Sequence, residues 1–296
     1  MSTHTGHPIL LCCDLDRTLI PNGKQPESPD ARKRLARVCQ HPEVHLTLIS
    51  GRDLGLVLSG IDEWQLPIPE FIIGDVGTTI YTPGASPRSL NPDDWISWPA
   101  WTAEIAPDWS GMTHDDITDL FKDLTALTPQ EREKQGLFKA SYYVDLAANQ
   151  DILEAELQRR LWRLGINARL IWSFDEMASV GLLDVLPINA SKLHAMEFLI
   201  HQQGYSVDRT LFAGDSGNDL HALTSQINAV LVANAEEEIK TKAIETVRAA
   251  GLSDTLYVAQ GDFLSMNGNY SAGVLEGLAH YLPETCAWME LDCAAT

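Results

Sequence analysis

The chain has 296 residues, of which 45% are hydrophobic, and a formal net charge of −20. This size and composition predict a globular protein of one large or two modest domains and exclude a disordered chain. Because acidic residues dominate and no Lys/Arg cluster occurs, we expect no nucleic-acid partner. We also expect no membrane segment, because no apolar run reaches the roughly 20 residues that a spanning helix needs. The five cysteines, an odd number, indicate reduced thiols and a cytoplasmic protein.

The first part of the chain alternates between strand and helix signals. Three buried strands are predicted, over residues 8–13, 44–50 and 70–75. One helix is predicted to follow Ser28 as its N-cap, with Pro29 at the first helical position, and a second helix is predicted to follow the N-cap Asp53. Strands separated by helices in this way predict a parallel sheet with crossover connections.

The middle of the chain has a different pattern. Residues 138–146 alternate between apolar and polar side chains, which is typical of a half-exposed strand in an antiparallel sheet. An amphipathic helix is predicted over residues 152–165, and two further strands over residues 168–174 and 180–187. Trp95, Trp98 and Trp101 recur at every third position, and we expect them to pack in a core rather than to stack on a sugar.

The strand–helix pattern then resumes and continues towards the C-terminus. Strands are predicted over residues 210–215, 228–233 and 255–259, and helices over residues 218–226, 235–250 and 271–282. The predicted fold class is therefore α/β, a Rossmann-like parallel-sheet core with an inserted α+β cap domain. The core is expected to comprise residues 1–83 and 186–296, and the cap residues 84–185.

Polar residues gather at the ends of the predicted core strands. In an open parallel sheet, ligands bind at the carboxyl ends of the strands, so these residues are expected to form one site. The candidates are Asp14, Asp16, Ser50, Gly51, Asp215 and Lys192, which follows the cap. Each of these short segments is weak evidence when taken alone, but "GDSGND" (214–219) is hard to explain by turn propensity.

This set of residues predicts phosphoryl transfer assisted by magnesium. Asp14 and Asp215 offer the hard oxygen ligands that Mg²⁺ prefers, and the cation would reduce repulsion between carboxylates and phosphate. With no activated Ser or Cys evident, Asp14 can act as the nucleophile and form an aspartyl-phosphate. Asp16 could then exchange protons with the leaving alcohol and with water. The predicted ligands of the phosphate oxygens are Ser50, the Gly51 amide and Lys192.

The segments "DLDRT", "SGR", Lys192 and "GDSGND" resemble, in order, the four motifs of the haloacid dehalogenase superfamily of phosphohydrolases. The resemblance implies that Asp14 is the nucleophile and Asp16 the general acid/base. It also implies that Ser50 and Lys192 bind phosphate. The metal site that it implies comprises Asp14, Asp16, Asp215, Asn218 and Asp219.

Longer segments narrow the resemblance to sucrose-phosphate phosphatases. These segments include "GDVGTTIYTPG", "LLDVLPINASK" and "YSAGVLEGLAHYL". In that family the core binds phosphate and magnesium while the cap reads the sugar, and Gln135 and Lys139 match positions near the sugar-reading segment. The expected substrate is a phosphorylated disaccharide or glycoside. Sucrose 6-phosphate is the first candidate, and the phosphates of mannosylfructose and glucosylglycerol are alternatives.

Two other functions stay open at this stage. The chain could be a phosphosugar mutase, since similar capped relatives move phosphate between positions of one sugar. It could instead be a non-catalytic module that binds a sugar phosphate and regulates a sugar-phosphate synthase, although the intact motifs favour an enzyme. The expected partners are thus a phosphosugar and such a synthase, and the expected oligomeric state is a monomer or weak dimer.

Overall fold

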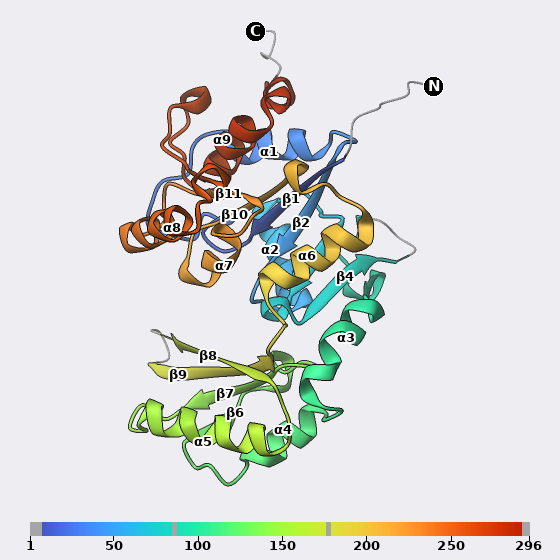
Figure 1. Cartoon of the computed structure of the whole chain (residues 1–296). Helices are drawn as coiled ribbons and strands as arrows, with labels where there is room; N and C mark the ends of the chain where they lie inside the picture. Colours follow the sequence, from blue (N-terminus) through green and yellow to red (C-terminus); the bar gives the residue numbers. More distant parts are fainter. Residues whose placement is uncertain (1–7, 85–87, 176–178, 292–296) are drawn as a thin grey trace.

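The computed structural model describes residues 8–84, 88–175 and 179–291. These residues form an eight-stranded sheet and a separate four-stranded sheet, which lie in the upper and lower parts of Figure 1. The predicted fold class is confirmed, because the larger sheet is a Rossmann-like core and the smaller one is the antiparallel sheet of a cap. Among the helices of the described residues, none is long and apolar enough to cross a bilayer.

The larger sheet has its first strand near the centre. Its strands are Ile9–Asp14 (β1), Val44–Ile49 (β2), Phe71–Gly74 (β3), Thr79–Pro83 (β4), Trp95–Ser97 (β5), Thr210–Gly214 (β10), Asn228–Leu231 (β11) and Leu256–Val258 (β12). Their order is β12-β11-β10-β1-β2-β3-β4-β5, and the six strands from β12 to β3 are parallel, as predicted. The chain leaves β1 towards β2 and later returns to β10 on the other side, so the strand order reverses beside β1.

Helices cover both faces of this sheet. Their bounds are Ala31–Cys39 (α1), Leu54–Trp64 (α2), Pro99–Ile105 (α3), Lys192–Gln203 (α6), Leu220–Leu223 (α7), Glu237–Ala250 (α8) and Ser271–Tyr281 (α9). Side chains of α1, α2 and α9 form one apolar cluster with the sheet, and those of α3, α6, α7 and α8 form another. Every residue of β1 is therefore buried, which explains its continuous apolar sequence.

The first helix begins later than predicted. The N-cap of α1 is Asp30, without a side-chain cap, and not Ser28. The Ser28 hydroxyl donates instead to Asn267 Oδ1 at 2.7 Å and accepts from the Asn267 N–H at 2.8 Å. A long-range contact therefore uses the side chain that would otherwise cap the helix. The predicted cap of α2 is confirmed, since the Asp53 carboxylate accepts from the Leu56 N–H at 3.0 Å.

The smaller sheet is antiparallel and has helices on one face. Its strands are Leu127–Pro129 (β6), Ala140–Val144 (β7), Ala168–Asp175 (β8) and Val180–Pro187 (β9), in the order β6-β7-β9-β8. The helices are His114–Phe121 (α4) and Gln150–Arg163 (α5), which pack on the sheet through a third apolar cluster. The other face of the sheet is turned towards the core (Figure 1).

The segment predicted as the cap, residues 84–185, also contributes to the larger sheet. Within it, β5 pairs with β4, for example Tyr81 with Ser97. The boundaries drawn from the sequence remain a prediction, and we propose that the cap proper begins after β5.

The three regularly spaced tryptophans contribute to apolar packing, as predicted. Trp95 and Trp101 are buried. The rings of Trp98 and Trp101 contact Phe198 of α6, with centroid distances of 5.5 and 5.1 Å. This packing holds the segment of Trp98 and Trp101, where the chain leaves the core, against α6, where the chain re-enters it.

Candidate active site

The predicted polar segments meet at the carboxyl ends of the central parallel strands. Asp14 is the last residue of β1, Ser50 follows β2, and Asp215 follows β10. Lys192 is the first residue of α6, and its side chain reaches the same region, where it contacts Asp14. Because the strand order reverses between β1 and β10, this is the place where open α/β sheets bind their ligands.

The Lys192 ammonium group is the centre of a buried cluster of charges. Its Nζ donates to Asp14 Oδ1 at 2.6 Å, to Asp219 Oδ1 at 2.8 Å and to Asn218 Oδ1 at 3.3 Å. The exposed fractions of Lys192, Asp14 and Asp219 are only 5%, 6% and 0%. Burial alone would lower the pKa of Lys192, but the two carboxylates raise it, so the ammonium group stays charged.

A third carboxylate gives the cluster an excess of negative charge. Asp14, Asp215 and Asp219 each place an oxygen within 4.8 Å of the others. Burial raises the pKa of Asp14, against the effect of Lys192, and raises the pKa of Asp215 to about 6. Asp215 Oδ2 is buried without a hydrogen bond in the described residues, although Arg17 Nε lies 3.2 Å away. A divalent cation with oxygen ligands would offset this charge, so the donor set fits Mg²⁺.

Asp219 is bound differently from Asp215. Its Oδ1 accepts from Lys192, while its Oδ2 accepts from the backbone N–H groups of Asp215 at 3.3 Å and Ser216 at 3.2 Å. Gly214 makes room for this side chain, because a Cβ there would lie 2.8 Å from Asp219 Cβ. Asp219 therefore braces the loop that carries Asp215, and both of its oxygens are already engaged.

Asp16 is held by an arginine that the sequence reasoning left unassigned. Arg52 Nε donates to Asp16 Oδ2 at 2.8 Å and Arg52 Nη2 donates to Oδ1 at 2.5 Å, while Asn22 Nδ2 also donates to Oδ1 at 2.8 Å. The Asp16 side chain is 39% exposed, unlike buried Asp14. The motif "SGR" contained the signal, because its third residue is Arg52.

A cavity of about 250 Å³ opens over this group of residues. Six of the predicted residues line it: Asp14, Asp16, Ser50, Gly51, Asp215 and Asn218. Arg17 and Arg52 add two cationic side chains to the same wall. Ser50 is buried, and its Oγ accepts from the Arg52 N–H at 3.1 Å. The size and polarity of this cavity suit a phosphoryl group.

A second cavity, of about 560 Å³, continues from the first and lies between core and cap. The two cavities share Gly51 and Asn218, and Lys192 lines the larger one. The cap contributes Arg169 of β8 and Asp184 of β9. Neither residue stands out in the sequence, because a charged residue on a half-exposed strand carries no local signal of the ligand that it faces.

Gln135 and Lys139, the predicted sugar-binding residues, are engaged within the protein. The Gln135 amide donates to the Gln130 and Ser141 carbonyls, and its oxygen accepts from the Ser141 N–H at 2.8 Å. Lys139 is buried, and its Nζ lies 3.4 Å from Asp75 Oδ1 of the core. Neither residue lines the larger cavity. Gln135 lines a different cavity, of about 520 Å³, together with Asp75 of the core, and the role of both residues in sugar binding remains a prediction.

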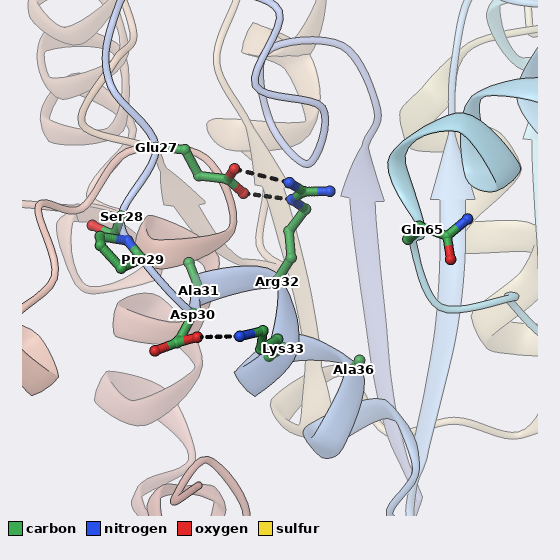
Figure 2. Close-up of a pocket in the computed structure, with 9 residues that line it drawn as sticks. All are labelled: Glu27, Ser28, Pro29, Asp30, Ala31, Arg32, Lys33, Ala36 and Gln65. Carbon is green, nitrogen blue, oxygen red and sulfur yellow. Dashed lines mark hydrogen bonds and ion pairs between the residues drawn. The ribbon is translucent and has the colours of Figure 1, made fainter.

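A further cavity, of about 580 Å³, lies at the start of α1 (Figure 2). Its charged side chains pair with each other, Arg32 with Glu27 at 2.6 Å and Lys33 with Asp30 at 2.7 Å. None of the residues predicted for the site lines it. This cavity is therefore separate from the chemistry described above.

Comparison with known proteins agrees with this geometry. The profile of the family described as sucrose-6F-phosphate phosphohydrolase matches residues 7–282. A protein of Nitrosococcus oceani that carries only a general HAD-like hydrolase name is 50% identical over 282 residues, which are 95% of this chain and 74% of that protein. The mannosylfructose-phosphate phosphatase of Agrobacterium fabrum is 27% identical over 278 residues, which are 92% of this chain and 96% of that protein.

A solved structure has the same fold. The sucrose-phosphatase of Synechocystis sp., in complex with sucrose and phosphate, is similar with a TM-score of 0.66 and 22% identity, over 93% of this chain and 98% of that chain. The profile match spans almost the whole sequence, including every motif that contributes to the site. The chain therefore belongs to the sucrose-6F-phosphate phosphohydrolase family of the haloacid dehalogenase superfamily, and it is a phosphatase of phosphoric monoesters.

Proposed function

We propose that the chain is a magnesium-dependent phosphatase that hydrolyses a phosphorylated disaccharide or glycoside, with sucrose 6-phosphate as the first candidate. The observation that carries this proposal is the buried contact of Lys192 with Asp14, at 2.6 Å, beside a cavity that core and cap line together. Phosphate and metal chemistry belong to the core, while the wider cavity has room for a sugar.

Asp14 is the proposed nucleophile, and Asp16 moves the protons. An Asp14 oxygen attacks phosphorus, the bond from phosphorus to the sugar oxygen breaks, and Asp16 donates a proton to that oxygen. The aspartyl-phosphate is then attacked by water, which gives its proton to Asp16, and the bond from phosphorus to Asp14 breaks. Inorganic phosphate leaves, and both carboxyl groups return to their starting states.

The surrounding residues hold the phosphate and the proposed cation. Ser50, the Gly51 amide and Lys192 are the proposed ligands of the phosphate oxygens, which is supported by the position of Ser50 and Gly51 in the cavity over Asp14 and by the contact of Lys192 with Asp14. Asp14 and Asp215 would hold Mg²⁺, which when bound supplies positive charge against the developing negative charge. Asp16 has to release at least one hydrogen bond of Arg52 before it can donate to the leaving oxygen.

We propose a cytoplasmic location and a link to a sugar-phosphate synthase. Cys12, Cys13, Cys39 and Cys286 are free thiols in the structure, which supports the proposed cytoplasmic location. A sugar-phosphate synthase is the proposed source of the substrate and a candidate partner. The mannosylfructose-phosphate phosphatase relative makes mannosylfructose phosphate the first alternative substrate, and glucosylglycerol phosphate follows it.

A phosphate-release assay tests the proposed function. The purified chain is incubated with the phosphates of sucrose, mannosylfructose and glucosylglycerol, with glucose 6-phosphate as a simple sugar control. We expect the highest kcat/KM for sucrose 6-phosphate, loss of turnover with EDTA, and recovery with added Mg²⁺. Undiminished activity in EDTA would exclude the metal requirement. An isomeric sugar phosphate formed in place of inorganic phosphate would identify a mutase.

A further inference from the structure

Two charged residues of the cap line the larger cavity without forming an ion pair with each other. Arg169 stands on β8 and Asp184 on β9, and the register places Ile171 opposite Asp184. Because alternate residues of a strand share a face, Arg169, Ile171 and Asp184 lie on the same side of the cap sheet. All three line the cavity that reaches Lys192. Among the described residues, neither Arg169 nor Asp184 takes part in an ion pair.

Arg169 has most of its hydrogen-bonding capacity unused. Its Nη2 donates to the Ile188 carbonyl at 2.8 Å, which fixes the guanidinium group at the edge of the cap sheet. A guanidinium group carries five N–H donors, so several of them remain for a ligand. Burial lowers the pKa of Arg169, and no neighbouring carboxylate counters that effect.

Asp184 is oriented by a chain of hydrogen bonds within the cap. Its Oδ1 accepts from the Ser141 hydroxyl at 2.5 Å. The Ser141 N–H in turn donates to Gln135 Oε1 at 2.8 Å, and that amide group is anchored to the Gln130 carbonyl. Asp184 Oδ2 makes no hydrogen bond within the described chain, so one acceptor oxygen is left for a ligand. Gln135 therefore contacts Asp184 only indirectly, through Ser141.

A guanidinium group and a carboxylate on one wall suit a neutral polyol. The two residues offer donors and acceptors at separate places in one cavity, which match hydroxyl groups at different positions of a disaccharide, and their opposite charges leave this wall without net charge. A second anionic group on the ligand would be repelled by Asp184. Neither side chain lines the smaller cavity over Asp14, so neither is placed to contact the phosphoryl group.

We propose that Arg169 and Asp184 are the specificity-determining pair of this chain, which bind hydroxyl groups of the sugar leaving group, and that Ser141 is a positioning residue for Asp184. This inference rests on the proposed function, because it names the residues that distinguish a phosphorylated glycoside from a simpler ester.

The test compares one large and one minimal substrate. The full chain and its Arg169→Gln and Asp184→Asn variants are assayed with sucrose 6-phosphate and with p-nitrophenyl phosphate. We expect each variant to lower the ratio of the two kcat/KM values about 10- to 100-fold, mainly through a higher KM for the sugar phosphate. Arg163→Gln, at the exposed end of α5 on the same cap, is the control and should keep the wild-type ratio.

The ratio of the two kcat/KM values separates an effect on sugar binding from an effect on the phosphoryl group or on folding. An equal loss on both substrates would show that the pair acts on the phosphoryl group or on folding and would overturn the inference. An unchanged ratio would overturn it as well. The wild-type protein alone tests the proposed function: if it hydrolyses p-nitrophenyl phosphate but none of the glycoside phosphates, that function fails and this inference fails with it.

The role of Ser141 needs a separate measurement. Ser141→Ala should raise the KM for sucrose 6-phosphate several-fold while kcat falls much less. If Ser141 acts through Asp184, combining Ser141→Ala with Asp184→Asn should raise KM no further than Asp184→Asn alone. Additive increases in KM would contradict a positioning role and indicate an independent effect.

Discussion

The Lys192 ammonium group neutralises carboxylates that could not otherwise share one buried site. It contacts Asp14 at 2.6 Å and Asp219 at 2.8 Å, and all three side chains are almost completely buried. Removing one partner of a buried ion pair is costly because the remaining charge has no solvent to stabilise it. At the scale of single residues, Lys192 is therefore expected to support both folding and catalysis.

We expect Lys192→Met to lower the free energy of unfolding by about 3 to 5 kcal/mol in metal-free buffer. Chemical denaturation followed by circular dichroism measures this change. Lys33→Met is the matched control, because Lys33 is exposed and its ion pair, with Asp30, is also at the surface, so its loss should cost less than about 1 kcal/mol. Equal stability of the two variants would contradict the importance of the buried cluster.

Asp14→Asn should separate chemistry from folding. The amide keeps the shape of the side chain but cannot attack phosphorus, so we expect kcat to fall by at least about 10³-fold. Stability should change little, because Lys192 keeps its contact with Asp219 and one of three crowded carboxylates is removed. Single-turnover phosphate release measures the effect, with exposed Asp119→Asn as the control. Turnover near the wild-type value would exclude Asp14 as the nucleophile.

At the scale of elements, a tight turn sets the position of α6. The 3₁₀ turn Asp75–Gly77 (η1) follows β3, and Gly77 has φ 95°. A Cβ at Gly77 would lie 2.5 Å from the Ser191 carbonyl carbon and 2.8 Å from the Lys192 nitrogen. Only glycine allows this close approach of two backbone segments, so the turn and the start of α6 are placed together.

Gly77→Ala should therefore displace Lys192 as well as strain the turn. We expect a loss of about 2 kcal/mol or more in unfolding free energy and at least a tenfold loss in kcat. Gly111→Ala is the matched control, since Gly111 also has a positive φ, 81°, but no atom lies within 4 Å of its added Cβ. The control should lose about 1 kcal/mol and retain kcat. If both variants keep full activity, the turn does not set the lysine position.

At the scale of the whole molecule, one buried ion pair joins core and cap. Asp75 of η1 and Lys139, just before β7, are exposed by only 5% and 7%, and their charged atoms lie 3.4 Å apart. Burial raises the pKa of Asp75, and Lys139 opposes that shift. Because each charge is buried, the pair contributes to the docking of the cap only while both partners are present.

Asp75→Asn should loosen the cap on the core. It leaves the Lys139 charge buried without its partner, and we expect about 3 kcal/mol less unfolding free energy and a larger radius of gyration in solution scattering. Adding Lys139→Met should restore much of that stability, because no charge then remains buried. The exposed pair Lys122–Asp119 is the control, and its loss should cost under 1 kcal/mol. A double variant less stable than the single one would contradict this account.

Much of the core could be predicted from the sequence, and less of the cap. Strands such as β1 are buried on both faces, so their apolar runs are unmistakable, and the polar residues that follow them, such as Asp14, meet by topology. Contacts between distant segments leave no local signal. Ser28 resembles a helix cap but bonds to Asn267, and Gln135 resembles a ligand-binding residue but saturates its amide within the cap. The sequence does not show that the face of β8 with Arg169 lines a cavity, because that cavity forms only when the cap packs against the core.

The route by which the chain leaves the cap has a mechanical consequence. Only residues 188–191 separate the end of β9, the strand of Asp184, from Lys192 at the start of α6. Halfway along, Asn189 is clamped to Asp108 by two hydrogen bonds of 2.9 and 3.0 Å. So short a tether cannot absorb much rotation. If the proposed sugar binds to β8 and β9 and tilts them, we expect the movement to reach the Lys192 ammonium group beside Asp14, the proposed nucleophile, through this one stretch of backbone.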